Sequence, residues 1–157
     1  MDPRRVNLEG SEPSASEKAT ASEKATASEK ARRLLIVDDA PDIVSSLTRL
    51  FDDPRIEIAV ASNGLQALSQ ARAFKPHVAI LDSKLPGMDG LGILNMLQQS
   101  SHYGAPRVIF FSAHADQRII AQARAMGAYA CIRKPRIDET LEKTVRDALE
   151  VDKLPAT

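Results

Sequence analysis

The fold is decided by an unbroken apolar run that ends in two aspartates, Leu34-Leu35-Ile36-Val37-Asp38-Asp39. Two similar runs follow: Val78-Ala79-Ile80-Leu81 ends at Asp82, and Val108-Ile109-Phe110-Phe111 ends at Ser112. Apolar runs without polar alternation are typical of strands that are covered on both faces, as in a parallel sheet. We therefore predict that these three runs are strands of one parallel sheet.

Two further runs complete the predicted sheet. Ile56-Glu57-Ile58-Ala59-Val60 alternates more, as an edge strand would, and Ala130-Cys131-Ile132 is a short run that ends near Lys134. Helical patterns follow the strands, with apolar residues on one face of each predicted helix. They are marked by Ile43, Val44, Leu47, Leu50 and Phe51; Leu65 and Leu68; Leu91, Leu94 and Leu97; Ile119, Ile120, Ala123 and Met126; and Leu141, Val145, Ala148 and Leu149. Five strand–helix units predict an α/β fold, with a doubly wound parallel sheet and helices on both faces.

Three residues indicate where predicted helices begin or end. Pro41 suits the first turn of a helix, because its missing N–H would have no partner there. Asn63 is a suitable N-cap for the second helix, since its side-chain oxygen can accept from an exposed backbone N–H. Gly127 is well placed to end the fourth helix.

The first 31 residues differ in composition from the rest of the chain. They repeat the hexapeptide Ala15-Ser16-Glu17-Lys18-Ala19-Thr20 at 21–26, and in part at 27–31. Such a segment cannot bury enough apolar surface to offset the entropy of the chain. We predict a disordered tail or spacer over residues 1–31, with a transient helix as the alternative. The folded domain is expected over residues 32–151, followed by a short stub over 152–157.

Composition limits the classes of protein that need to be considered. The chain has 157 residues, which suits one domain plus a tail, and 43% hydrophobic residues, which is enough for a core. Its formal net charge of zero gives no support to a nucleic-acid or membrane partner. The single cysteine, Cys131, excludes an intrachain disulfide and indicates a reducing compartment. Because the sequence also lacks a secretory signal and a long apolar run, we expect a cytoplasmic, soluble protein.

Polar side chains end four of the predicted strands: Asp38 and Asp39, Asp82, Ser112, and Lys134. Ligands of open parallel sheets bind beyond the carboxyl ends of the strands. Three carboxylates brought together repel, and a hard cation such as Mg²⁺ relieves this repulsion. A carboxylate beside the metal can accept a phosphoryl group, while a lysine screens the transferring oxygens and a hydroxyl donates to them. Each residue alone fits a helix cap or a solvated side chain, but their joint placement favours a phosphoryl-transfer site.

Four blocks of the sequence resemble the receiver domains of two-component response regulators. They are Leu35-Ile36-Val37-Asp38-Asp39, Leu81-Asp82-Ser83-Lys84-Leu85-Pro86-Gly87-Met88-Asp89-Gly90, Phe111-Ser112-Ala113 and Arg133-Lys134-Pro135. The resemblance covers nearly all of residues 32–151. It implies a flavodoxin-like sheet with its five strands in the order 2-1-3-4-5.

The resemblance also implies a metal site and a phosphoacceptor. Asp82 would accept the phosphoryl group from a phosphohistidine on a histidine kinase or a phosphotransfer protein. Asp38, Asp39, Asp82 and the backbone carbonyl of Lys84 would hold Mg²⁺, with Asp39 a more direct ligand than Asp38. Such a protein is not an enzyme in the usual sense, because it catalyses only its own phosphorylation and dephosphorylation.

A second set of implied roles concerns the switch. Ser112 would follow the phosphoryl group, Lys134 would pair with it, and the Lys134–Pro135 bond would be cis. The family often has an aromatic residue at the position of Cys131, so the usual aromatic switch is in question here. Tyr129 either substitutes for it, on the same strand face as Cys131, or is a partly exposed residue at the strand entry.

Three neighbours of the predicted pocket also bear on signalling. Lys84 and His114 occupy positions that influence the lifetime of the phosphoryl group in the family. Arg136 stands where the family often has a large apolar residue.

Three functions remain open at this point. The first is a single-domain regulator that signals to a downstream protein target through its fourth helix, fifth strand and fifth helix. We expect this because only a short stub follows Leu149. The second is a phosphate sink that drains phosphoryl groups from a shared kinase. The third is a binding module that ignores phosphorylation, which the unusual Cys131 suggests and the complete acidic site opposes.

Overall fold

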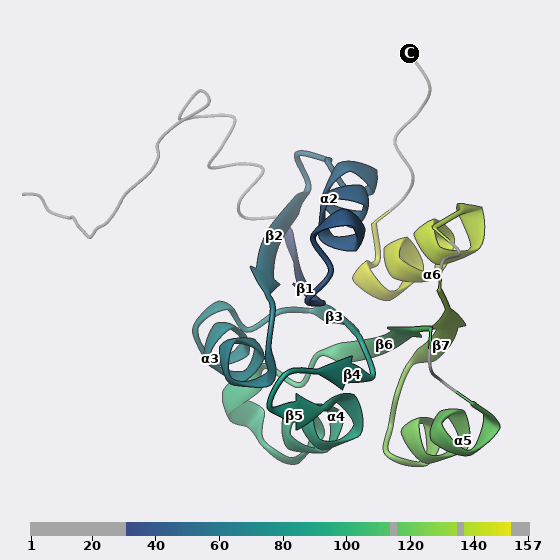
Figure 1. Ribbon diagram of the computed structural model, residues 1–157. Coiled ribbons are helices and arrows are strands. Elements are labelled where there is room, and N and C mark those ends of the chain that lie inside the picture. The colour runs from purple at the N-terminus through teal and green to yellow at the C-terminus, as the bar shows by residue number, and fades with distance from the viewer. Residues whose placement is uncertain (1–30, 114–115, 135–136, 152–157) are drawn as a thin grey trace, which may run out of the picture. The chain divides into compact units, whose positions relative to one another are not determined.

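The protein is described here by a computed structural model that covers residues 31–113, 116–134 and 137–151. Five parallel strands form one sheet in the order β2-β1-β3-β6-β7 (Figure 1). Their bounds are β1 Arg32–Val37, β2 Ile56–Ala61, β3 Val78–Leu81, β6 Arg107–Ser112 and β7 Ala130–Arg133. Counted among these five strands, the order is 2-1-3-4-5, so the predicted topology is confirmed, with the alternating strand β2 at an edge.

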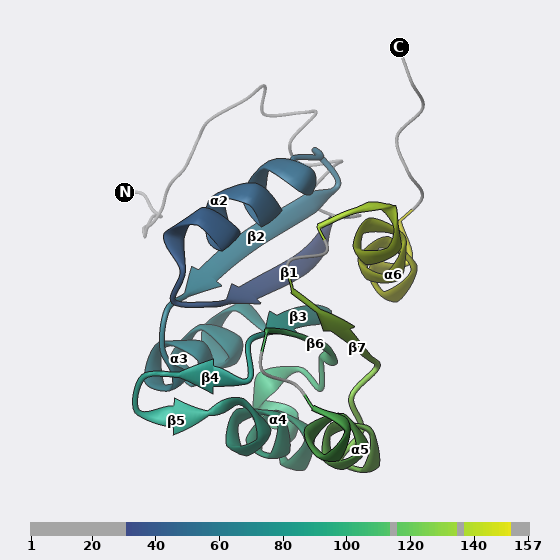
Figure 2. The same ribbon diagram turned by 45° about the vertical axis from the view of Figure 1, so that its right-hand side comes forward.

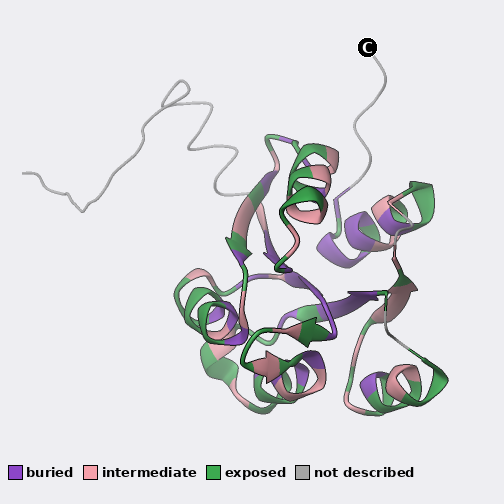
Figure 3. Cartoon of the chain, viewed as in Figure 1, coloured by how far each residue is buried: buried purple, intermediate pink, exposed green. Residues whose placement is uncertain are grey.

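Helices cover both faces of the sheet, as expected. Figures 1 and 2 show α2 (Pro41–Leu50) and α6 (Glu139–Leu149) on one side. The other side carries α3 (Gly64–Phe74), α4 (Gly90–Gln99) and α5 (Gln117–Ala125). The central strands therefore lie between two layers of helices and are buried along most of their length (Figure 3).

Two apolar clusters, one on each face of the sheet, explain why the strand sequences are uninterrupted. Leu34 and Ile36 of β1 belong to the cluster that also contains Leu47 of α2 and Leu141 of α6. Leu35 and Val37 point the other way and join the cluster that includes residues of α3, α4 and α5. Because successive side chains of a strand alternate between faces, a strand covered on both faces needs apolar residues at every position.

The predicted helix boundaries are also present. Pro41 is the first residue of α2, and the Asn63 side chain accepts a hydrogen bond of 2.8 Å from the backbone N–H of Gln66 at the start of α3. Gly127 follows α5 with a φ of +101°, a conformation in which glycine is free of the usual side-chain clash. Local signals therefore place these helix ends correctly.

Two short elements were not predicted from the sequence. A small antiparallel hairpin of β4 (Lys84–Leu85) and β5 (Met88–Asp89) follows Asp82, and a 3-10 helix, η1, spans Ser101–Tyr103. Gly87 turns the hairpin with a φ of +83°. The hairpin leads directly into α4, where the Gly92 N–H donates to the Asp89 carboxylate at 2.8 Å.

Several predictions concern residues outside the described ranges. These are the disordered tail up to residue 30, the cis bond before Pro135, the roles of His114 and Arg136, and the stub over 152–157; Ala31, at the end of the predicted tail, is described and buried. Among the described helices, none is long and apolar enough to cross a lipid bilayer.

Candidate functional site

Five of the six predicted site residues lie at the carboxyl ends of four neighbouring strands. Asp38 and Asp39 follow β1, Asp82 follows β3, Ser112 is the last residue of β6, and Lys134 follows β7. Strand pairing aligns these ends, since Val37 pairs with Leu81 and Ser112 with Arg133. The topology thus brings together residues that are almost one hundred positions apart in the chain.

Three carboxylates form the acidic part of the site. Asp38, Asp39 and Asp82 each place a carboxylate oxygen within 4.8 Å of the other two. Asp38 and Asp82 are buried, at 3% and 6% exposure, while Asp39 is exposed. The backbone N–H of Ala40 donates to Asp38 Oδ1 at 3.0 Å, which fixes that carboxylate at the start of α2. A group of carboxyl oxygens with one side open to solvent suits a hard cation that retains water ligands, so the donor set fits Mg²⁺.

Lys134 provides the positive charge of the site. Its Nζ lies 2.6 Å from Asp38 Oδ2 and 3.3 Å from Asp82 Oδ2, and its side chain is only 12% exposed. The ammonium also lies 5.8 Å from the centre of the Phe111 ring, within the range of a cation–π contact. One lysine against three carboxylates leaves two formal negative charges in excess, so the site attracts a further cation.

Ser112 is fully buried, and its hydroxyl forms a hydrogen bond with the hydroxyl of Ser83. Ser83 directly follows Asp82 and is 6% exposed. Sequence reasoning did not single out Ser83, although a hydroxyl next to the predicted phosphoacceptor is a signal that could have drawn attention to it. The structure therefore adds one residue to the predicted set.

The chain around Asp82 and Ser83 is held by the start of α4. The backbone N–H of Gly90 donates to the Ser83 carbonyl oxygen at 2.8 Å. A Cβ atom on Gly90 would lie 2.5 Å from the Asp82 carbonyl oxygen and 2.7 Å from Ser83 Cα. Only glycine allows this close approach, so the glycine that ends the LPGMDG loop has a packing role beside the site.

Lys84 has an exposed side chain at the start of β4. Its backbone N–H lies 3.4 Å from Asp82 Oδ1, which is a long hydrogen bond. This contact places the first residue of the hairpin beside the acidic group. That the Lys84 carbonyl is a metal ligand stays a prediction.

The two residues considered for an aromatic switch occupy different places. Cys131 pairs with Phe110 in the sheet and packs against the core beneath α3, α4 and α5, where burial raises the pKa of its thiol despite the nearby Arg124. Tyr129 precedes β7, is 46% exposed, and lies under the Arg107 guanidinium at 5.7 Å. Arg107 begins β6 whereas Ser112 ends it, so Tyr129 is a partly exposed residue at the strand entry, far along β6 from the hydroxyl.

Comparison with known proteins identifies relatives of this chain. The family model for the response regulator receiver domain matches residues 34–146. Sporulation initiation phosphotransferase F of Bacillus subtilis (strain 168) is 34% identical over 119 residues, which cover 75% of this chain and 90% of that protein. Protein-glutamate methylesterase/protein-glutamine glutaminase 3 of Myxococcus xanthus is 36% identical over 115 residues, or 70% of this chain. The match spans only 32% of that methylesterase, so the similarity does not extend to most of its length.

A solved structure gives the same result for the fold. The CheX–CheY–BeF3–Mg+2 complex from Borrelia burgdorferi contains a chain that matches with a TM-score of 0.67 and 26% identity. The match covers 74% of this chain and 87% of that one. Sequence and structure thus point to the same family.

Proposed function

Because this chain belongs to the response-regulator receiver family of two-component signal transduction, we propose that it is a signalling module phosphorylated on Asp82. The observation that carries the proposal is the meeting of Asp38, Asp39 and Asp82 with the Lys134 ammonium at one edge of the sheet. Charge of both signs at a partly buried site is what phosphoryl transfer requires, since the reaction depends on positioning and on screening of the phosphoryl oxygens.

The proposed reaction transfers a phosphoryl group from a phosphohistidine. A carboxylate oxygen of Asp82 forms a bond to phosphorus, while the bond between phosphorus and the histidine nitrogen breaks and the nitrogen keeps its electron pair. Lys134 already contacts Asp82, at 3.3 Å, and would pair with the phosphoryl oxygens. The Ser112 hydroxyl would donate a hydrogen bond to the same group.

Receiver domains bind Mg²⁺ at their acidic pocket, and we propose the same for this chain. Asp38, Asp39, Asp82 and the Lys84 carbonyl would hold the ion. When bound, Mg²⁺ supplies positive charge that offsets the carboxylates and the incoming phosphoryl group. The two excess negative charges of the site support this assignment.

The proposed output is an interaction with another protein. Receiver domains interact with histidine kinases or phosphotransfer proteins, and a downstream target would bind the face formed by α5, β7 and α6. Within the proposed receiver domain, residues 32–151, this face borders Lys134, because Lys134 directly follows β7 and precedes α6 in the chain. A change of charge at Asp82 therefore occurs beside the proposed binding face.

Intact-mass measurement after incubation with Mg²⁺ and acetyl phosphate tests the proposal. We expect a single phosphoryl adduct on the wild type and none on Asp82→Asn. Asp116→Asn is a matched control, because Asp116 is an exposed N-cap of α5 and asparagine can replace it there. An adduct on the control but not on Asp82→Asn supports the assignment, and a folded wild type without an adduct contradicts it.

The decay of the adduct separates two modes of signalling. A phosphate sink needs rapid loss of the phosphoryl group, whereas a regulator that acts through a target needs a lasting adduct. A lifetime of hours would contradict the sink. If a target binds Asp82→Asn as tightly as it binds the wild type, the result would instead favour a binding module that does not depend on phosphorylation.

A further inference from the structure

We propose that Ser83 is a positioning residue that restrains the Ser112 hydroxyl until Asp82 is phosphorylated. This inference rests on the proposed function, in which Ser112 donates to the phosphoryl group. Its basis is the hydrogen bond between the two serine hydroxyls in the unphosphorylated protein. In this view the bond to Ser83 must be exchanged for a bond to phosphate.

Burial makes this hydrogen bond important. Ser112 is fully buried and Ser83 is 6% exposed, so water has little access to either hydroxyl. A buried hydrogen bond that is broken costs free energy, so the contact with Ser83 favours the present position of the Ser112 side chain. Either hydroxyl can be the donor in this bond, and in both cases the Ser112 side chain must leave Ser83 when it turns toward a phosphoryl oxygen.

Ser83 is also unable to follow Ser112 toward the phosphoryl group. Its carbonyl oxygen accepts from the Gly90 N–H at 2.8 Å, and the Gly90 Cα lies so close that a Cβ there would come within 2.7 Å of Ser83 Cα. The start of α4 therefore fixes the chain at Ser83. The side chain of Ser112 turns instead, while its carbonyl oxygen stays bonded to the Lys134 N–H at 3.1 Å.

The exchange has a predictable direction. The Ser83–Ser112 bond stabilises only the unphosphorylated state, and a ligand shifts an equilibrium by its differential interaction with the two states. Ser83→Ala removes this preference, so it should strengthen binding of a phosphoryl mimic. From the usual net worth of one hydrogen bond, we expect a gain in affinity of roughly 2- to 10-fold.

The experiment titrates beryllofluoride, a phosphoryl mimic, in the presence of Mg²⁺. The chain has no tryptophan, so binding is followed by fluorine NMR rather than by tryptophan fluorescence. Wild type, Ser83→Ala, Ser112→Ala and the double variant form a double-mutant cycle. Ser69→Ala, which changes an exposed serine of α3, is the control and should bind as the wild type does.

We expect Ser83→Ala to tighten binding in the wild-type background and to have no effect in the Ser112→Ala background. An effect that persists without the Ser112 hydroxyl would overturn the proposal, because Ser83 would then act by another route. Unchanged or weaker binding by Ser83→Ala alone would also overturn it. If the wild type binds no better than Asp82→Asn, the proposed function fails as well, so the two failures are distinguishable.

Discussion

At the scale of single residues, Lys134 acts as the internal cation of an acidic site. It contacts Asp38 and Asp82 at 2.6 and 3.3 Å, yet three carboxylates lie within 4.8 Å of one another. The residual repulsion opposes folding in the absence of a metal ion. The arrangement favours binding of a cation but lowers the folding stability of the metal-free protein, as functional sites often do.

Asp39→Asn should therefore stabilise the metal-free protein. Asp39 is the exposed member of the cluster, so solvent screens its repulsion and the gain in unfolding free energy should not exceed about 1 kcal/mol. Urea unfolding at low salt measures it, and the gain should shrink at high salt. Mg²⁺ affinity should fall in the same variant.

The control for this prediction is Asp52→Asn. Asp52 is an exposed aspartate in the turn between α2 and β2, at the other end of the strands from the acidic cluster. Its replacement should change neither the free energy of unfolding nor the Mg²⁺ affinity. A loss of stability in Asp39→Asn would show that Asp39 makes a net favourable interaction, and would contradict the electrostatic account.

The sequence predicted which residues gather at this site, but it did not predict the contact that Ser83 makes with Ser112. The aspartates, Ser112 and Lys134 could be found because each follows an apolar run, and the end of a strand fixes its place in a parallel sheet. Ser83 could not be found in this way. It lies in a loop, where side-chain direction follows no period and depends on the close packing of Gly90.

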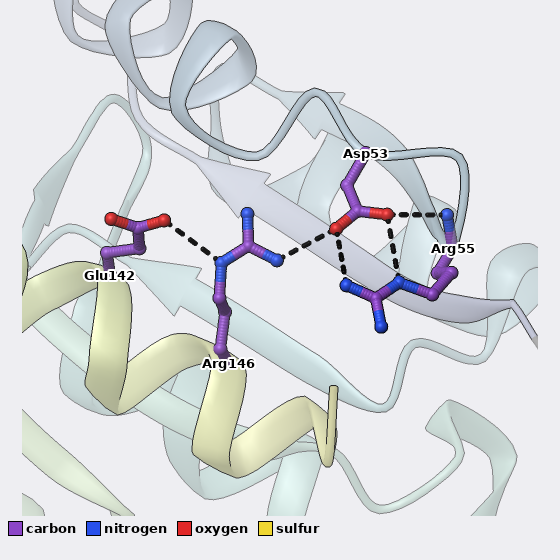
Figure 4. A network of polar contacts seen from close by, with 4 residues as sticks. All are labelled: Asp53, Arg55, Glu142 and Arg146. Carbon is purple, nitrogen blue, oxygen red and sulfur yellow. Dashed lines mark hydrogen bonds and ion pairs between the residues drawn. The ribbon is translucent and has the colours of Figure 1, made fainter. Parts of the chain in front are cut away.

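At the scale of elements, a buried ionic network joins α6 to the turn between α2 and β2 (Figure 4). The fully buried Asp53 carboxylate accepts from Arg146 Nη1 at 2.9 Å and from Arg55 at 3.1 and 3.2 Å. Burial raises the pKa of Asp53, but the hydrogen bonds from Arg55 and Arg146 outweigh this and hold it at about 2. Arg146 also pairs with Glu142 and lies against the Phe51 ring.

Asp53→Asn should weaken the attachment of α6. The change leaves the buried Arg146 without its main counter-charge, and breaking a buried pair in this way typically costs about 3 kcal/mol or more. Glu142→Gln is the matched variant, because Glu142 pairs with the same arginine at i,i+4 but is more exposed. Its cost should be below about 1 kcal/mol. Denaturant unfolding compares them, and equal losses would contradict the dominance of Asp53.

Among the elements, too, some were predicted from the sequence and others were missed. The long helices were predicted from their one apolar face, and the central strands from apolar residues at every position, because helices cover both faces of the sheet. The hairpin of β4 and β5 was missed, because strands of two residues have no readable period. The network was missed because Asp53 and Arg146 are 93 positions apart, and no sequence pattern pairs residues at such a separation.

At the scale of the whole molecule, the pattern of apolar runs determined the class of fold, whereas the order of the strands came from the family resemblance. Alternating strands and helices require a parallel sheet with right-handed crossovers, but several strand orders satisfy that rule. The edge position of β2 was the exception. Its sequence is not a continuous apolar run, two of its residues, Glu57 and Val60, are exposed, and β2 does lie at an edge.

Two ionisable groups at the amino ends of the strands make the stability of the whole molecule depend on pH. His77 precedes β3, and its Nδ1 accepts from the Arg33 backbone N–H at 2.9 Å. Burial, and then the charges of Arg32 and Arg33, lower the pKa of His77 from 6.5. Asp53 has its pKa lowered from 3.8 to about 2. In both cases the folded state resists the proton more than the unfolded state does.

The free energy of unfolding should therefore fall in two separate steps on acidification. Above pH 6.5 the contribution of His77 is complete, and it is lost as the pH falls from there through its lowered folded pKa. The contribution of Asp53 is complete above pH 3.8 and is lost toward pH 2. The shift of Asp53 corresponds to about 2 kcal/mol.

Urea unfolding at a series of pH values distinguishes these two steps. In His77→Asn, the amide oxygen can accept from Arg33 but does not titrate, so the first step should disappear while the second remains. In Asp53→Asn, the first step should remain and the second should disappear. A first step that is unchanged in His77→Asn would mean that another group resists protonation near neutrality. In that case the His77 ring, which accepts from the Arg33 N–H, would not be the group responsible for the pH dependence of stability near neutrality.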